Sequence, residues 1–558
     1  MDVQDPKNQL EKIRRQQEEN MAQQRAESHG IPYLNLSTIP MRPEIVTILD
    51  EQIAKDARMA VIQKKGPILT VAIENPNNPK TIDVLKKLKK DSERVDVFLV
   101  SRSSLEVAWT SYSTKKIDKT EITGAVELSE AVVQDFRERI SSVSDIGKVL
   151  NEVSKKNASG AFEALIGTSM AMGGTDIHIE PLKEGATVRV KIDGILYESA
   201  RLDPHIYNLI LSRVKLLSKL KLNVKNEPQE GRFSAIFADR QIEIRTSILP
   251  AEYNEDIALR LLDPKFLLSL KDLGLRKDLE EILVLTLKKP QGLILVTGAT
   301  GAGKTTTLYA CIKFLKTSEV KIITIEDPIE YHLEGITQTQ VREKEGYIFE
   351  TGLKAILRQD PDIVLISELR SPDAAEASIQ AALAGRQVLS TLHTIDAAGT
   401  IPRLLDMGID AAAVSSALSA SIAQRLIRKL CQNCKTKRKL KDNEYEIMSN
   451  ALEGLPENMD AVKIKKDSYV WEPPENGCTE CYNTGYKGRT GIFEIMEITR
   501  GIEEKILTNP SEDELRDFAH KEGMTNLKQD GILKILEGIT SIEEIERVLG
   551  TLNLNTSK

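Results

Sequence analysis

One eight-residue segment constrains the fold of this chain more than any other feature of its sequence. The segment from Gly298 to Thr305 reads GATGAGKT and fits the phosphate-loop pattern G-x-x-x-x-G-K-[ST]. The apolar run from Leu293 to Val296 precedes it, and a helical pattern follows it. Glycines let backbone N–H groups turn toward a phosphate, the lysine faces the β/γ oxygens and the threonine hydroxyl can coordinate magnesium. A glycine-rich turn that binds nothing is the less favoured interpretation. The predicted nucleotide-binding residues are Gly298, Ala299, Thr300, Gly301, Ala302, Gly303, Lys304, Thr305 and Thr306.

The length of 558 residues requires several folded units, because single hydrophobic cores rarely grow past about 250 to 300 residues. Strands and helices alternate after Gly292, which predicts a parallel sheet covered by helices in a multidomain α/β protein. The expected parts are a charged helix or tail at 1–30, a small α/β domain at 31–125, a second mixed domain at 126–265, the phosphate-loop domain at 266–428, a cysteine-rich subdomain at 429–495 and a helical tail at 496–558.

Helical periodicity is expected at several places outside the phosphate-loop domain, including residues 81–88. Residues 45–54 predict one helix, and 129–172 predict two. The tail from Thr499 to Leu549 predicts helices broken by Pro510, Gly523 and Gly538.

Polar side chains follow three further apolar runs that read as strands. Glu326 follows Lys321 to Ile325, and Glu368 comes two residues after Ile366. Carboxylates at the carboxyl edge of an open α/β sheet can polarise an attacking water or act on the magnesium shell. His393 follows a fourth strand and is predicted to sense the γ-phosphate. A solvated acidic turn at Glu326 and a structural histidine at His393 are the alternatives.

Four of the five cysteines form two C-x-x-C pairs, separated by 43 residues. Four thiolates at such spacing are typical of a structural Zn²⁺ site in a reducing compartment, although the separation exceeds that of a usual zinc ribbon. A redox dithiol is the alternative. The predicted zinc ligands are Cys431, Cys434, Cys478 and Cys481.

The charge balance disfavours a nucleic-acid-binding protein. The 83 acidic and 76 basic side chains leave a net charge of -7, and aromatic residues make up only 4% of the chain. The sequence also contains no secretory signal or apolar run long enough to span a membrane, so a cytoplasmic protein is expected.

Taken in order, these motifs resemble the secretion and pilus ATPase superfamily, specifically the type IV pilus assembly and type II secretion ATPases. Residues 325–330, IEDPIE, resemble the aspartate box of that family, and 357–368 resemble its Walker B segment. Residues 390–394, STLHT, resemble its histidine box, and 424–431 resemble the entry to its metal-binding insert. Segments at 174–181, 188–194, 228–232, 242–245 and 257–260 resemble its second N-terminal domain, and 30–35 resemble its adaptor domain more weakly.

The resemblance implies a RecA-like ATPase domain, preceded by a PAS-like domain and an N-terminal adaptor domain. It implies a homo-hexamer that uses ATP and Mg²⁺ and works at the inner face of the cytoplasmic membrane, with an inner-membrane platform protein and a cytoplasmic adaptor as partners. Hydrolysis would rotate the second domain against the ATPase domain. Arginines of the second domain would close on the nucleotide, and Arg232, Arg245 and Arg260 match those motif positions.

Several positions depart from the family pattern. Asn226 and Glu227 replace basic residues, and Ser367, Ser371 and Arg386 replace a glycine, an aspartate and a histidine. A further departure concerns the cyclic dinucleotide that some relatives bind through the N-terminal domain. The arginine expected just before Gly30 is absent, with Ser28 and His29 in its place. This absence disfavours such a ligand.

Two other functions remain open from the sequence. One is a DNA-uptake or conjugation-type ATPase whose zinc module grips DNA. The other is a regulatory subunit that binds nucleotide without hydrolysing it.

Overall fold

The computed structural model describes residues 6–36, 43–46, 48–65, 68–91, 94–115, 125–154, 158–237, 240–455 and 464–552. The chain divides into two compact units, Met1–Ala125 and Val126–Lys558, and each is described by itself. No helix within the described ranges is long and apolar enough to cross a lipid bilayer.

The first unit is a small sheet with helices around it. Strand β2 lies between β1, which runs antiparallel to it, and β3, which runs parallel. The helix predicted at 45–54 is wrong as a single element, because α2 and α3 are separate. Asp50 caps the start of α3 by accepting hydrogen bonds from the N–H groups of Gln52 and Ile53. The elements are α1 (Pro6–His29), α2 (Pro43–Val46), α3 (Glu51–Asp56), β1 (Met59–Lys65), β2 (Ile68–Ile73), α4 (Pro79–Asp91), β3 (Arg94–Leu99) and α5 (Arg102–Lys115).

The second unit begins with a seven-stranded antiparallel sheet in the order β4-β8-β9-β10-β5-β6-β7. Three helices precede β5 rather than the two predicted for 129–172. One break follows α6, where Asp145 accepts hydrogen bonds from the N–H groups of Ser141 and Ser142 and closes a turn. The elements are β4 (Ala125–Leu128), α6 (Glu130–Arg139), α7 (Asp145–Ser154), α8 (Ala158–Ala171), β5 (Gly174–Leu182), β6 (Gly185–Ile192), β7 (Ile195–Leu202), α9 (Pro204–Leu217), β8 (Gln229–Phe237), β9 (Arg240–Pro250) and β10 (Glu255–Leu262).

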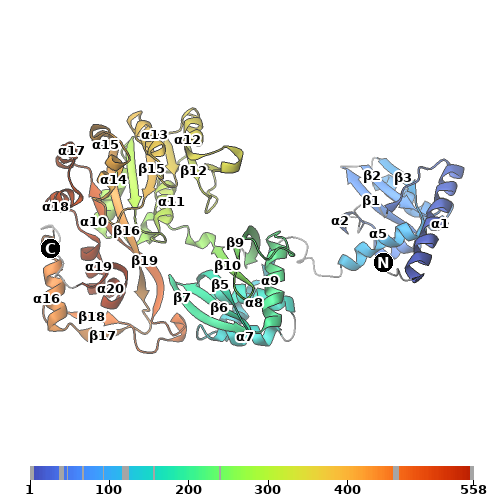
Figure 1. Cartoon of the computed structure of the whole chain (residues 1–558), viewed down its shortest axis with the longest axis horizontal. Helices are drawn as coiled ribbons and strands as arrows, with labels where there is room; N and C mark the ends of the chain where they lie inside the picture. The colour runs from blue at the N-terminus through green and yellow to red at the C-terminus, as the bar shows by residue number, and fades with distance from the viewer. Residues whose placement is uncertain are drawn as a thin grey trace. The chain divides into compact units, whose positions relative to one another are not determined.

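The phosphate-loop region is built on a second seven-stranded sheet, in the order β13-β12-β14-β15-β11-β16-β19. Of these strands, β12, β15, β16 and β19 are labelled in Figure 1. All neighbouring strands are parallel except β16 and β19. The carboxyl ends of β11, β12, β14 and β15 therefore meet at one edge, as predicted. The elements are α10 (Lys277–Leu287), β11 (Gly292–Thr297), α11 (Lys304–Leu315), β12 (Ile322–Glu326), β13 (Thr337–Gln340), α12 (Phe349–Leu357), β14 (Ile363–Ile366), α13 (Pro372–Leu383), β15 (Gln387–Leu392), α14 (Thr400–Asp406), α15 (Ala411–Ala417), β16 (Leu418–Leu430) and β19 (Tyr486–Glu497).

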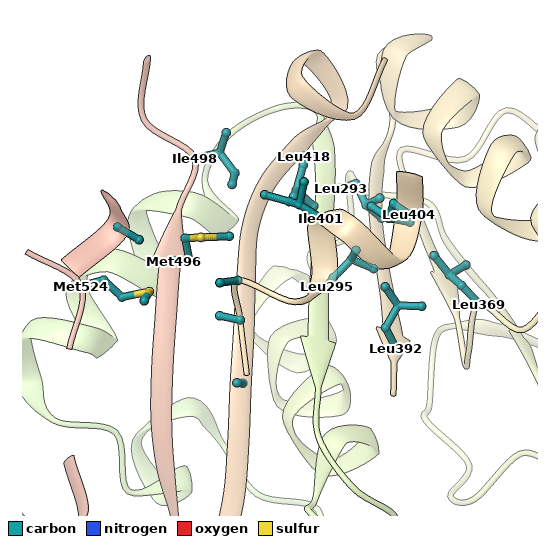
Figure 2. Packing of buried hydrophobic residues seen from close by; sticks show 14 of the residues in the cluster. Leu293, Leu295, Leu369, Leu392, Ile401, Leu404, Leu418, Met496, Ile498 and Met524 are labelled. Carbon is teal, nitrogen blue, oxygen red and sulfur yellow. The ribbon is translucent and has the colours of Figure 1, made fainter. Parts of the chain in front are cut away.

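The core beneath this sheet joins the phosphate-loop region to the C-terminal tail. Leu293 and Leu295 of β11 belong to the same buried cluster as Met496 of β19 and Met524 of the tail (Figure 2). Burying apolar side chains is the main favourable term in folding. The tail is therefore part of the body that carries the phosphate loop.

The cysteine-rich and tail regions complete the second unit. The antiparallel pair β17 and β18 and the helix α16 follow the first cysteines. The tail forms four helices, and the predicted breaks at Pro510, Gly523 and Gly538 all lie between them. The elements are β17 (Thr436–Lys439), α16 (Asp442–Ala451), β18 (Tyr469–Glu472), α17 (Arg500–Ile506), α18 (Glu512–Lys521), α19 (Leu527–Leu536) and α20 (Ile542–Leu549).

Candidate functional site

The phosphate loop lies between the buried strand β11 and the helix α11, in the middle of the sheet. Its glycines adopt backbone angles that other residues avoid, with φ of 146° at Gly298, 79° at Gly301 and 91° at Gly303. These angles carry the chain from a strand end into the first turn of a helix. Free backbone N–H groups at a helix N-terminus attract anions, so the loop has the features of a phosphate site.

The Lys304 ammonium lies over this loop. Its Nζ donates to the carbonyl oxygens of Gly298 at 2.7 Å and Ala299 at 3.4 Å. Burial lowers the pKa of Lys304; the negative charge of Glu368 opposes that shift and the positive charge of Arg425 adds to it. The lysine is thus held at the loop, where phosphate oxygens would bind.

Gln424, on the neighbouring strand β16, braces the loop. Its side chain accepts a hydrogen bond from the Thr307 hydroxyl at 2.7 Å and donates to the carbonyl oxygen of Ala302 at 2.8 Å. A Cβ atom added to Gly298 would lie 2.6 Å from the carbonyl oxygen of Gln424. The close approach of β16 therefore requires glycine at that position.

Arg425 places a second cation beside the loop. One guanidinium nitrogen donates to the carbonyl oxygen of Gln424 at 2.9 Å, and the other donates to that of Ile395 at 3.0 Å. Burial lowers the pKa of Arg425, while the charges of Glu494 and Asp396 act in the opposite direction. Sequence reasoning missed both Gln424 and Arg425 as site residues. Their only signal is a polar pair that follows the apolar first half of a strand.

Glu368 and His393 come together at the same edge of the sheet. His393 Nε2 lies 2.9 Å from Glu368 Oε1, and His393 Nδ1 lies 3.5 Å from Lys304 Nζ. Glu368 and His393 follow the ends of β14 and β15, and Lys304 is the first residue of α11. The structure thus groups three of the predicted catalytic residues around the phosphate loop.

Arg370 adds a cation to this group. Its Nε donates to the other Glu368 oxygen at 3.0 Å, and its second nitrogen lies 3.5 Å from Asp327. Arg370 and His393 both have side chains about half exposed, at 58% and 47%. Glu368 therefore has partners that face solvent.

Glu326 has a different environment at the end of β12. Its carboxylate is buried and accepts hydrogen bonds from Thr324 Oγ1 at 2.6 Å, Gln338 Nε2 at 3.1 Å and the hydroxyl of Tyr309. Burial, and then the charge of Glu326, raise the pKa of Tyr309, so this hydroxyl remains a donor. Across the described residues, no hydrogen bond or ion pair links Glu326 to Lys304, Glu368 or His393.

The three predicted arginines line one cavity of about 630 Å³, together with Pro328, Ile329 and Gln340 of the phosphate-loop region. Arg245 donates to the carbonyl oxygen of Ile329 at 2.6 Å and pairs with Glu330 at 2.8 Å. The structure brings the arginines to the segment that follows Glu326, and not to the phosphate loop of the same chain.

Acidic partners hold the other two arginines. Arg260 lies 3.0 Å from Asp176, and Arg232 lies 3.8 Å from Glu243. Burial acts against the charged form of Arg260, but the hydrogen bond and charge of Asp176 outweigh it and raise its pKa.

The departures from the family pattern lie where they leave the phosphate loop intact. Ser371 caps α13 by accepting a hydrogen bond from the N–H of Ala374 at 3.2 Å. Arg386 precedes β15, at the end of the sheet opposite His393. Asn226 and Glu227 are exposed.

The four predicted zinc ligands form one cluster, with all sulfurs within 4.8 Å of one another. Cys431 lies 3.7 Å from Cys478, and Cys481 lies 3.8 Å from Cys434 and Cys478. Four thiolates about 2.3 Å from a central Zn²⁺ form a tetrahedron with edges of roughly 3.8 Å. The donor set and its spacing fit a structural zinc ion.

Comparison with family models gives two matches. A model described as type II/IV secretion system protein matches residues 151–547, and one described as MshEN domain matches 29–115.

Relatives with named activities match much of the chain. The type IV pilus assembly ATPase PilB of Pseudomonas aeruginosa is 34% identical over 537 residues, which is 95% of this chain and 90% of that protein. The type II secretion system protein E of Aeromonas hydrophila is 40% identical over 386 residues, which is 69% of this chain and 74% of that protein. Among solved structures, the ATPase DotB of Yersinia pseudotuberculosis shares the fold, with a TM-score of 0.50 and 20% identity over 71% of this chain and 94% of that one.

Proposed function

Because this chain belongs to the type II/IV secretion system protein family, we propose that it is an ATP-hydrolysing motor that powers pilus assembly or type II secretion. The family and the α/β multidomain fold that the motifs predicted are both confirmed by the matches. The single observation that carries the proposal is the grouping of Lys304, Glu368 and His393 around the phosphate loop.

Within this group, Lys304 is the residue that balances phosphate charge. Transfer of a phosphoryl group spreads negative charge over its oxygens, and fixed cations stabilise that charge most where water is excluded. Arg425, which lies against the same loop, adds a second fixed cation. Both cations are held by backbone carbonyl oxygens, so little reorganisation is needed when ATP binds.

Glu368 is the residue that we assign to the attacking water. Its carboxylate lies at the strand end beside Lys304, and its partners face solvent, so a water molecule can reach it. Glu326 is buried under three donors, which supports a positioning role for it instead. His393, between Glu368 and Lys304, would orient the carboxylate and contact the γ-phosphate.

The residues present also fit the two metals of this ATPase family. Thr305 is exposed in the first turn of α11, where its hydroxyl can hold Mg²⁺, which would offset the charge of the β- and γ-phosphates. The four cysteines would hold Zn²⁺, which ties the loop after β16 to the loop before β19.

The assembly that we propose is a homo-hexamer at the inner face of the cytoplasmic membrane, working with an inner-membrane platform protein and a cytoplasmic adaptor. Arg232, Arg245 and Arg260 would then act on the nucleotide of a neighbouring subunit, which is consistent with their distance from the phosphate loop of their own chain. Hydrolysis would move their domain against the ATPase region.

Of the two processes, the extent of the matches supports pilus assembly. The pilus assembly relative aligns with 95% of the chain, whereas the secretion relative aligns with 69%. Deleting the gene in its host should remove surface pili while secreted enzymes still leave the cell. The opposite pattern would assign the motor to secretion.

The central test is ATP hydrolysis by the purified chain and by Lys304→Ala. Loss of the ammonium should lower the rate at least about 100-fold, because transferring phosphate loses its main fixed charge. Lys313→Ala, which removes a lysine from the last turn of the same helix, is the matched control and should keep the wild-type rate. Equal rates for Lys304→Ala and wild type would remove the phosphate loop from the mechanism.

A further inference from the structure

The loop between β15 and α14, residues 393–399, touches the nucleotide site with one end. It begins with His393, and the N–H of Thr394 donates to Thr297 Oγ1 on β11 at 2.8 Å. The next residue, Ile395, accepts the hydrogen bond from Arg425 at its carbonyl oxygen. The position of this loop therefore sets the position of two groups at the phosphate loop.

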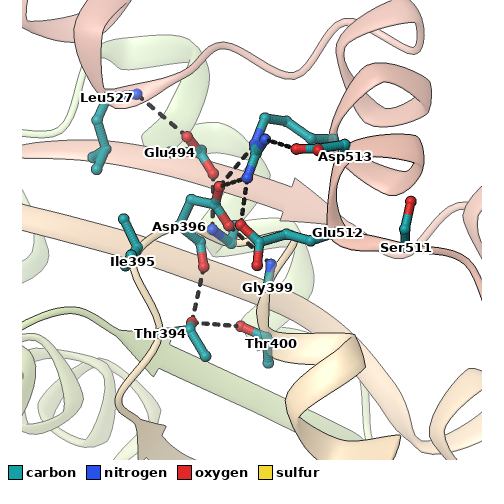
Figure 3. Close-up of polar contacts among 12 residues, drawn as sticks. Thr394, Ile395, Asp396, Gly399, Thr400, Glu494, Ser511, Glu512, Asp513 and Leu527 are labelled. Carbon is teal, nitrogen blue, oxygen red and sulfur yellow. Dashed lines mark hydrogen bonds and ion pairs between the residues drawn. The ribbon is translucent and has the colours of Figure 1, made fainter. Parts of the chain in front are cut away.

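The other end of the loop is held by the C-terminal tail. Asp396 Oδ2 accepts from Arg516 Nε at 2.8 Å and lies 2.6 Å from its Nη2, while Asp396 Oδ1 accepts from the N–H of Gly399 at 2.8 Å (Figure 3). Arg516 lies on α18, 120 residues further along the chain. The carboxylate thus connects the turn of the loop to a helix of the tail.

Acidic side chains of its own helix also hold the guanidinium of Arg516. Asp513 lies 2.5 Å from one guanidinium nitrogen, and Glu512 contacts another, both from the same helix. Glu512 also lies against the loop, because a Cβ atom added to Gly399 would be 3.1 Å from its carboxylate. An ion pair that is partly buried and part of a network holds geometry better than an isolated surface pair.

A second contact fixes the middle of the loop. The N–H of Ala397 donates to Glu494 Oε1 on β19 at 2.8 Å, and the side chain of Ala397 is buried. This contact anchors the loop to the sheet, and the Thr394 hydroxyl donates to the carbonyl oxygen of Asp396 at 2.9 Å. Arg516 adds the contact from the tail to the Asp396 carboxylate.

We propose that Arg516 is a positioning residue for ATP hydrolysis: by pairing with Asp396, it fixes the 393–399 loop and so holds His393 between Glu368 and Lys304. The tail helices then contribute to the nucleotide site without touching the nucleotide. This inference rests on the proposed function. It also requires that the effect of Arg516 pass through His393.

The expected signature is a change in turnover rather than in nucleotide binding. Gln424 holds the phosphate loop through Thr307 and Ala302, which lie outside residues 393–399, so the KM for ATP should stay within about 2-fold. Displacing a reacting group by about 1 Å can cost up to roughly 100-fold in rate. Arg516→Gln should therefore lower kcat about 10-fold.

The experiment measures kcat, KM and melting temperature for the full-length chain and its variants. Arg516→Lys should recover at least about half of the wild-type kcat, because both guanidinium contacts reach the same oxygen of Asp396 and one ammonium can replace them. Asp396→Asn should behave like Arg516→Gln. Arg500→Gln is the matched control, since it breaks an exposed ion pair with Glu504 on another tail helix and should leave kcat unchanged.

The decisive comparison adds Arg516→Gln to a chain that already carries His393→Gln. If Arg516 acts through His393, the second change should lower kcat by less than about 2-fold. The same loss in both backgrounds, or a kcat for Arg516→Gln equal to that of Arg500→Gln, would overturn the proposal. If Arg516→Gln does not fold, the Arg516→Lys and Asp396→Asn results decide by the same criteria.

Failure of the proposed function would be recognised separately. It would appear as a wild-type rate no higher than that of Lys304→Ala, before any tail variant is compared.

Discussion

Two neighbouring strands of the ATPase sheet, β12 and β14, each deliver a glutamate to the same edge, yet the two carboxylates differ in almost every respect. Glu326, on β12, is buried and accepts three side-chain hydrogen bonds, while Glu368 lies beside Lys304 with partners that face solvent. Position at a strand end is therefore not enough to assign a catalytic role. What differs is whether water can reach the carboxylate: the side chain of Glu368 is 20% exposed, whereas Glu326 is buried.

The largest effect should come from Glu368→Gln, which keeps the shape of the side chain and removes the base. General-base catalysis is worth about 100- to 10,000-fold, so kcat should fall within that range while the KM for ATP changes little. Single-turnover hydrolysis by the purified variant measures this. A rate within about 3-fold of wild type would show that Glu368 does not prime the water and would remove the basis of the comparison.

A smaller effect, on stability, is expected when the pH is raised, and it comes from Glu494. This glutamate is buried, and within the described ranges its hydrogen-bond donors are the N–H groups of Ala397 and Leu527. Burial raises its pKa to about 7, well above the ordinary value near 4.5. Between these values the folded state holds a proton that the unfolded state releases, so this group makes the unfolding free energy fall as pH rises.

The full loss between pH 4.5 and 7 would be roughly 3 kcal/mol. The fall should be absent in Glu494→Gln, and melting of both proteins across that pH range measures the difference. Equal pH dependence in the two proteins would mean that the two backbone donors offset burial and that folding does not raise the pKa of Glu494.

The smallest effect is expected from Glu326→Gln. The amide keeps one acceptor but presents N–H to the Tyr309 hydroxyl, which leaves a buried donor without its partner at a cost of about 1 to 3 kcal/mol. The melting temperature should fall, while kcat should drop much less than in Glu368→Gln. A loss of kcat as large as that of Glu368→Gln, with stability unchanged, would reverse the assignment of the two carboxylates.

Much of this site could be predicted from local sequence. The phosphate loop is recognisable because its glycines, lysine and threonine are adjacent and follow an apolar strand. The strand ends at Glu368 and His393 could be predicted to meet, since parallel strands align their carboxyl ends. The four cysteines could be grouped because their side-chain chemistry and paired spacing are specific.

The remaining parts of the site depend on contacts between distant segments. The burial of Glu326 comes from Tyr309 and Gln338 on other elements, so a carboxylate after a strand looks the same in the sequence whether it is buried or accessible. Gln424 reaches the phosphate loop from more than 100 residues away, and Arg516 reaches Asp396 from 120. Periodicity predicted two helices over 129–172, whereas the structure has three, and the turn after α6 is closed by the side chain of Asp145.

Strand β16 connects two sites, the phosphate loop and the cysteine cluster. Gln424, near the middle of β16, contacts the phosphate loop, and Cys431 follows the last residue of the strand. The two residues are about 23 Å apart at the usual rise per residue. A hydrogen-bonded strand resists stretching. A shift of the phosphate loop would therefore be transmitted along β16 to the cysteine cluster. A zinc ion held by the cysteines would then anchor the far end of the strand, and removing it should affect ATP hydrolysis at the phosphate loop.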